Sequence, residues 1–161
     1  MSDGRPARAI AILSAGIAGL TLAFGQAAIA QSTPLHVPIV YLKETIEEPL
    51  PLSLVEPVAE DNGLAGAKLA IGDNNTTGSF LKQEFELVEK MIPAGGDLKA
   101  AAAELSSARQ KFVIADLTAP RLTELADLPE MKDAVIFNIR AEDDGLRAAD
   151  CRANVLHTIP S

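Results

Sequence analysis

Polar side chains stand directly after two short apolar runs in the middle of this 161-residue chain. Residues 112–115 are followed by Asp116 and Thr118, and residues 134–137 by Asn138 and Arg140. Continuous apolar runs rich in β-branched residues are typical of parallel strands that are buried on both faces. The carboxyl ends of such strands meet at one edge of an open α/β sheet, where ligands bind. These residue types therefore predict a ligand-binding edge, without yet defining a function.

Helices and further strands must position that edge. Between the two runs, Pro120 suits the first turn of a short helix and Pro129 closes it, so residues 111–140 predict a β-α-β unit. Residues 37–42 form a compact apolar run that predicts the first strand. The half-polar alternation of residues 84–91 is typical of an edge strand.

The remaining segments complete an α/β fold. Residues 145–149 suggest a short helical turn, and residues 154–157 a last strand. Asp97 suits the N-cap of a helix that presents four apolar residues to the sheet: Leu98, Ala101, Ala102 and Leu105. The predicted fold class is an open, mostly parallel sheet with helices on both faces.

Residues 60–75 fit a helix and a strand equally well by pattern. We expect a helix, because parallel strands on either side need a crossover. Gly63, Gly66 and Gly72 would weaken that helix, so its stability must come from close packing on the sheet. Residues 73–84 nearly match a calcium-binding loop, but we expect Gly78 to end the helix there and assign no metal.

The first 30 residues have the features of a secretory signal peptide. Arg5 and Arg8 precede an apolar run at residues 9–23, and small residues follow at the expected cleavage point. The run is shorter than the roughly 20 residues that a membrane span needs, and glycines interrupt it. Residues 31–161 are therefore predicted to be one mature domain, exported to the periplasm.

The composition and the cysteine count exclude some functions and leave others open. The formal net charge of −8 argues against nucleic acid as a partner. Cys151 is the only cysteine, and although His157 is near it in sequence, no base stands in an evident arrangement. The chain has only two histidines, no Gly-x-Ser-x-Gly motif and no phosphate-binding glycine loop. We therefore expect a binding protein rather than an enzyme, with an exported α/β sensory domain or a small hydrolase as alternatives.

The order of the predicted elements, a strand, a Gly- and Ala-rich helix and then alternating strands and helices, carries a resemblance to a known family. It resembles the amino-terminal lobe of type I periplasmic substrate-binding proteins of the leucine-binding type, which serve ABC importers. Four stretches make the resemblance more specific: GLAGAKLAIGDNNTTGSFLKQEFEL, KFVIADL, DDGLR and DCRANVLHTIPS. They are similar to the branch linked to pyrroloquinoline-quinone-dependent alcohol dehydrogenase systems.

This resemblance implies a two-lobed protein that closes on a small ligand and delivers it to a membrane permease, without a cofactor. The second lobe is absent from the sequence, and a disulfide partner for Cys151 would lie there. The ligand would be pyrroloquinoline quinone, a related solute of alcohol oxidation, or an amino acid. A periplasmic quinoprotein dehydrogenase system is a further expected partner.

The resemblance also implies three ligand-binding loops, which follow the first, third and fourth strands beside the topological switch point. Their predicted ligand-binding residues are Lys43 and Glu44, then Asp116, Leu117 and Thr118, then Asn138 and Arg140. The charges of Asp116 and Arg140 favour a polyanionic ligand, which Arg140 would clamp. Two structural alternatives stay open: Asp116 would cap the following helix, and Arg140 would pair with Glu142 or Asp143.

Overall fold

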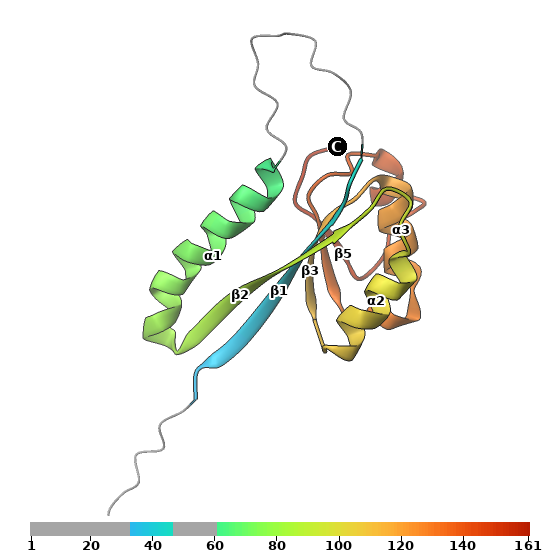
Figure 1. The fold of residues 1–161 in the computed structure, drawn as a ribbon. Helices are drawn as coiled ribbons and strands as arrows, with labels where there is room; N and C mark the ends of the chain where they lie inside the picture. The colour runs from blue at the N-terminus through green and yellow to red at the C-terminus, as the bar shows by residue number, and fades with distance from the viewer. Residues whose placement is uncertain (1–32, 47–60) are drawn as a thin grey trace, which may run out of the picture. The chain divides into compact units, whose positions relative to one another are not determined.

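The computed structural model describes residues 33–46 and 61–161, so the predicted signal peptide and residues 47–60 lie outside the described residues. Five strands form one sheet in which every neighbouring pair is parallel, in the order β2-β1-β3-β4-β5 (Figure 1). Their bounds are Leu35–Glu44 for β1, Gln83–Ile92 for β2, Phe112–Asp116 for β3, Val135–Asn138 for β4 and Val155–His157 for β5. Each lies within a few residues of the strand predicted from sequence.

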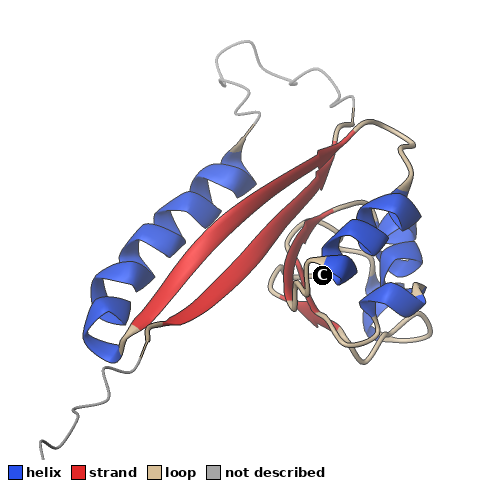
Figure 2. Ribbon diagram, turned by 60° about the horizontal axis from the view of Figure 1, so that its bottom comes forward, coloured by secondary structure: helices blue, strands red, loops and turns tan. Residues whose placement is uncertain are grey.

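Three α-helices connect these strands (Figure 2). They are α1 (Asn62–Leu81), α2 (Leu98–Ser107) and α3 (Ala119–Asp127), with short 3-10 helices at Pro129–Met131 and Asp144–Arg147. Asp97 caps α2 as predicted, because its side chain accepts a hydrogen bond from the Ala100 N–H at 2.9 Å. Pro120 occupies the first turn of α3, where its missing N–H costs nothing.

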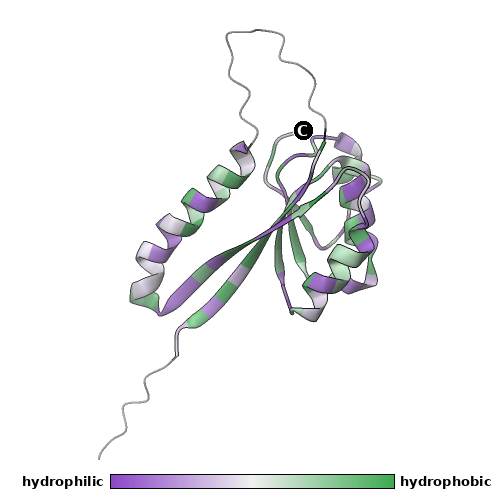
Figure 3. Ribbon diagram, in the orientation of Figure 1, coloured by the Kyte–Doolittle hydropathy of each residue, from purple (hydrophilic) through white to green (hydrophobic). Residues whose placement is uncertain are grey.

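The helices cover both faces of the sheet. Alternate residues of a strand point to opposite faces, and Figure 3 shows hydrophobic residues along the strands and on the helices. Val40 and Leu42 of β1 pack with α2 and α3 in the main core, whereas Tyr41 packs with Leu64 and Ala67 of α1 on the opposite face. The α/β class with helices on both faces is therefore confirmed.

The end of α1 differs from the prediction. The helix runs through Gly78 to Leu81, and Lys82 adopts the left-handed conformation that ends it, with φ of 55°. Gly78 is needed for packing instead, since a Cβ there would lie 2.7 Å from the Gln83 carbonyl oxygen. Asn75 lies inside α1, where its side chain accepts from the Phe85 N–H at 2.7 Å and donates to the Phe85 C=O at 2.8 Å. The calcium-like pattern is thus mostly helix and cannot wrap around an ion.

Candidate functional site

Asp116, the last residue of β3, is the centre of a polar cluster at the carboxyl edge of the sheet. Its side chain is 8% exposed. The Tyr41 hydroxyl donates to Oδ2 at 2.6 Å, and an Arg140 guanidinium nitrogen donates to Oδ1 at 3.0 Å. The Lys43 ammonium lies 3.9 Å from Oδ2. The four residues come from β1, β3 and the segment after β4, so the strand order itself brings them together. We refer to Tyr41, Lys43, Asp116 and Arg140 as the Asp116 cluster.

The first turn of α1 packs against this cluster. A Cβ at Gly63 would lie 2.6 Å from the Tyr41 hydroxyl and 3.4 Å from Asp116 Oδ2, so only glycine fits without a shift. Asp61 at the N-cap makes no capping hydrogen bond with its side chain. Because Gly63 lies in the first turn, the positive end of the helix dipole is directed at the same edge as Lys43 and Arg140, and the Asp61 carboxylate acts on Tyr41 from there as well.

The electrostatics of the cluster keep Tyr41 protonated. Burial raises the pKa of Tyr41 well above its ordinary value, and the hydrogen bond to Asp116 and the charge of that carboxylate raise it further. The charge of Arg140 acts in the opposite direction on this pKa but is outweighed. Tyr41 is thus a neutral donor to Asp116, and the charge of Asp61 at the start of α1 also raises the pKa of Tyr41.

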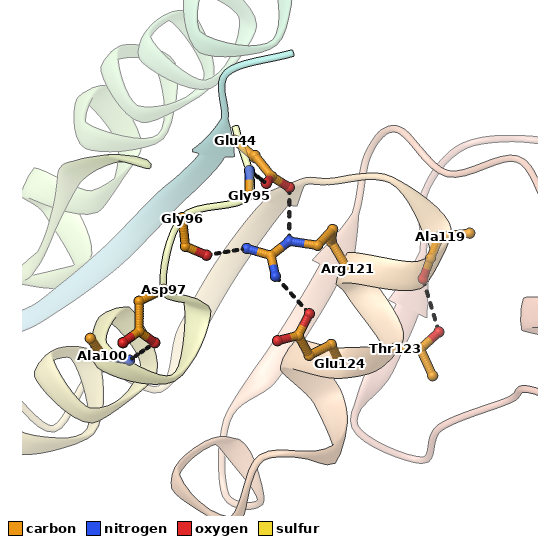
Figure 4. Close-up of polar contacts among 9 residues, drawn as sticks. All are labelled: Glu44, Gly95, Gly96, Asp97, Ala100, Ala119, Arg121, Thr123 and Glu124. Carbon is orange, nitrogen blue, oxygen red and sulfur yellow. Dashed lines mark hydrogen bonds and ion pairs between the residues drawn. The ribbon is translucent and has the colours of Figure 1, made fainter. Parts of the chain in front are cut away.

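Glu44, a predicted ligand residue, belongs to a different cluster on the opposite face of the sheet (Figure 4). Its side chain accepts from the Gly95 N–H at 2.7 Å and from the Arg121 Nε–H at 3.0 Å. Arg121 also donates to the Gly96 carbonyl and to Glu124, both at 2.6 Å. Burial alone would lower the pKa of Arg121, but these hydrogen bonds to Glu44 and Glu124 raise it overall. Neighbouring residues of a strand face opposite ways, so Glu44 lies on the other face from Lys43. There its side chain connects β1 to the β2–α2 loop and to α3.

The structure separates three other predicted residues from the Asp116 cluster. Leu117 is 1% exposed and packs in the main core, so its side chain is structural. Thr118 is the N-cap of α3, although its side chain makes no capping bond. Asn138 is fully buried and bonds the turn that follows it. Of the seven predicted residues, Lys43, Asp116 and Arg140 are brought together.

The two structural alternatives are also resolved. Thr118 rather than Asp116 is the N-cap of α3, and Arg140 forms an ion pair with Asp116. Tyr41, however, is a member of the cluster that the sequence interpretation missed. Two signals were present: it is two residues from Lys43 on the same strand face, and a buried tyrosine hydroxyl normally needs a partner.

A separate hollow of about 590 Å³ lies beside α3 and the Asp144–Arg147 turn. Its charged lining is entirely acidic, from Glu124, Asp143, Asp144 and Asp150. An anion would be repelled there, whereas the Asp116 cluster contains two cationic side chains, Lys43 and Arg140. The charge distribution therefore favours the cluster over the hollow as a contact for an anionic ligand.

No protein-family model and no curated protein matches this chain. Within residues 33–46 and 61–161, no helix combines the length and apolar character needed to cross a membrane. In the same ranges, no group of three or more His, Cys, Asp and Glu side chains is arranged to hold a metal ion.

Proposed function

We propose that this chain is the amino-terminal lobe of an exported substrate-binding protein of the leucine-binding type. In this proposal it binds a small solute that carries at least one carboxylate in the periplasm and delivers it to the permease of an ABC importer. Pyrroloquinoline quinone, with its several carboxylates, is the first candidate ligand, and an amino acid is the second.

The observation that supports this function most directly is the position of the Asp116 cluster. In a sheet of order β2-β1-β3-β4-β5, the connections leave β1 and β3 in opposite directions, which makes their carboxyl ends the topological switch point. Lys43 lies at the end of β1 and Asp116 at the end of β3. Ligands of open α/β sheets bind at this position.

The charges of the cluster support an anionic ligand. Lys43 and Arg140 both direct their cationic groups at this edge, and a ligand carboxylate would join Asp116 as a partner of these two side chains. The amino-terminal turn of α1 lies beside them and adds a partial positive charge. Tyr41 and Asp116 would then act mainly to hold Arg140 and Lys43 in position.

Binding is best tested with Tyr41, the only tyrosine in a chain that has no tryptophan. A ¹³C-tyrosine label in the full chain gives one aromatic spin system that lies inside the cluster, so even weak binding is detected by NMR titration. We expect weak binding, because a single lobe supplies only one wall of a two-lobed site. Pyrroloquinoline quinone and leucine are the probes, and citrate is the control for nonspecific attraction of a polycarboxylate.

Saturable shifts of the Tyr41 signal with one probe, absent with citrate, would support the proposal. Arg140→Ala should then weaken binding by about 10- to 100-fold, because a charge-assisted contact is lost. Arg152→Ala is the matched control, since Arg152 forms a comparable ion pair with Asp127 outside the cluster. Equal effects of both substitutions, or no response to either probe, would refute the assignment of the ligand to this edge.

A further inference from the structure

Asn138 makes four hydrogen bonds through its buried side chain. Its Oδ1 accepts from the Arg140 N–H at 3.1 Å and from the Ala141 N–H at 2.9 Å. Its Nδ2 donates to the Ala141 carbonyl at 2.7 Å and to His157 Nδ1 at 2.9 Å. A carboxamide has two donor hydrogens and two acceptor lone pairs, so its hydrogen-bonding capacity is filled within the protein. Nothing remains for a ligand.

The orientation of this amide is fixed by its partners. If the amide were rotated by half a turn, Nδ2 would face two backbone N–H groups and Oδ1 would face the Ala141 carbonyl. Because Nδ2 therefore points at His157, the imidazole Nδ1 must accept, which places the proton of the neutral ring on Nε2. His157 Nε2 is buried and makes no hydrogen bond. The His157 ring thus makes its hydrogen bond through Nδ1, which accepts from Asn138.

These bonds shape the turn that carries Arg140. The turn begins at the end of β4, where the Ile139 N–H bonds the Ala115 carbonyl of β3 at 3.2 Å. The Asn138 carbonyl accepts two hydrogen bonds from Thr158, from its N–H at 3.1 Å and from its hydroxyl at 3.0 Å. The Arg140 side chain reaches Asp116 from this turn. A change in the turn would therefore move the guanidinium away from the carboxylate.

We propose that Asn138 is the positioning residue of Arg140, and that His157 supports it by accepting the second hydrogen of the Asn138 amide. Asn138 thereby acts on the Asp116 cluster through the backbone of Arg140 and never touches the ligand. The inference concerns the same site as the proposed function, but it is tested without any ligand, so the two can fail separately.

The test uses the NMR signal of ¹³C-labelled Tyr41 in the full chain, recorded without added ligand. Arg140→Gln defines the shift that follows when the guanidinium leaves Asp116, since Arg140 acts electrostatically on the Tyr41 hydroxyl. Asn138→Leu has nearly the same shape without polar atoms, and it should move the Tyr41 signal toward the Arg140→Gln position.

A matched control separates positioning from general loss of stability. Asn154 also bridges backbone groups, donating to the Ala126 and Met131 carbonyls at 3.3 and 3.2 Å, but it lies away from the cluster. Asn154→Leu should lower stability without moving the Tyr41 signal. His157→Leu should give part of the Asn138→Leu shift, and His157→Gln, whose side-chain oxygen can accept from Nδ2, should give less.

An unmoved Tyr41 signal in folded Asn138→Leu would overturn the proposal, as would an equal shift in Asn154→Leu. If Asn138→Leu does not fold, Asn138→Ser decides. Its hydroxyl oxygen still accepts from the turn, so the Tyr41 signal should stay near its wild-type position, and a full shift to the Arg140→Gln position would contradict the inference.

Discussion

Gly63→Ala and Gly66→Ala should change stability in opposite directions, although both glycines lie in α1. Alanine is favoured over glycine in a helix interior by about 1 kcal/mol. A Cβ at Gly66 meets nothing within 4 Å, so this gain should be realised, and Gly66→Ala should stabilise the protein by up to about 1 kcal/mol. A Cβ at Gly63 would lie 2.6 Å from the Tyr41 hydroxyl, which cannot stay in place.

The cost at Gly63 follows from what the hydroxyl would lose. Moving it breaks its 2.6 Å bond to the Asp116 carboxylate, and hydrogen bonds to charged groups contribute about 1.5–3 kcal/mol. After subtraction of the helix gain, Gly63→Ala should destabilise the protein by about 0.5–2 kcal/mol. Urea unfolding followed by circular dichroism measures the difference as a change in midpoint at constant slope.

A double-mutant cycle with Tyr41→Phe identifies the cause. Phenylalanine has no hydroxyl to be displaced, so only the 3.2 Å contact with the Ile139 side chain would resist the new Cβ. Gly63→Ala should therefore be nearly neutral in the Tyr41→Phe background, with a coupling of about 1 kcal/mol or more between the two sites. The reasoning is refuted if Gly63→Ala stabilises the wild-type protein as Gly66→Ala does, or if the two substitutions are additive.

Three further predictions concern pH, the second cluster and export. Because the pKa of Tyr41 is raised on folding, its contribution to stability is present below about pH 10, the ordinary tyrosine value, and is lost as the pH rises above it. Urea unfolding should therefore show a lower free energy of unfolding at pH 11 than at pH 8, and Tyr41→Phe should lack this part of the decrease. Glu44→Ala should lower the free energy of unfolding by about 3 kcal/mol or more, since it leaves Arg121 without its buried partner. Glu124→Ala should lower it by less than about 1 kcal/mol, because Glu124 is half exposed. Similar unfolding midpoints for both variants would contradict this. The intact mass of periplasmic material should correspond to a chain that begins at Gln31, and a species that keeps the preceding apolar run would revive a membrane anchor.

The strands were predictable because each is an apolar run ended by polar or turn residues, as in residues 112–115 followed by Asp116. The end of α1 was not. Asn75 and Gly78 have poor helix propensity, and what keeps them helical is tertiary: an amide bonded to Phe85 and a glycine packed on the Gln83 backbone. Local sequence contains neither contact.

The sequence predicted where in the sheet the candidate site lies, but not all of the residues that belong to it. Position relative to strand ends identified Lys43, Asp116 and Arg140, because parallel strands bring their carboxyl ends together. Glu44 was included by the same criterion, yet strand alternation sends it to the other face, where Arg121 holds it. Asn138 was included because it is polar, but whether its amide is used internally depends on the turn and on His157.

The two hydrogen bonds between Asn75 and Phe85 also affect how the edge of the sheet can pair with other polypeptide chains. β2 is the outermost strand on its side of the sheet, and such a strand offers its outward N–H and C=O groups to any extended peptide that approaches. At Phe85 the Asn75 amide already occupies both groups, much as a short piece of neighbouring strand would. An incoming peptide would have to displace it to pair continuously. α1 thus protects the sheet against strand addition, and an exchange of Asn75 for alanine would remove that protection even where it left the helix intact.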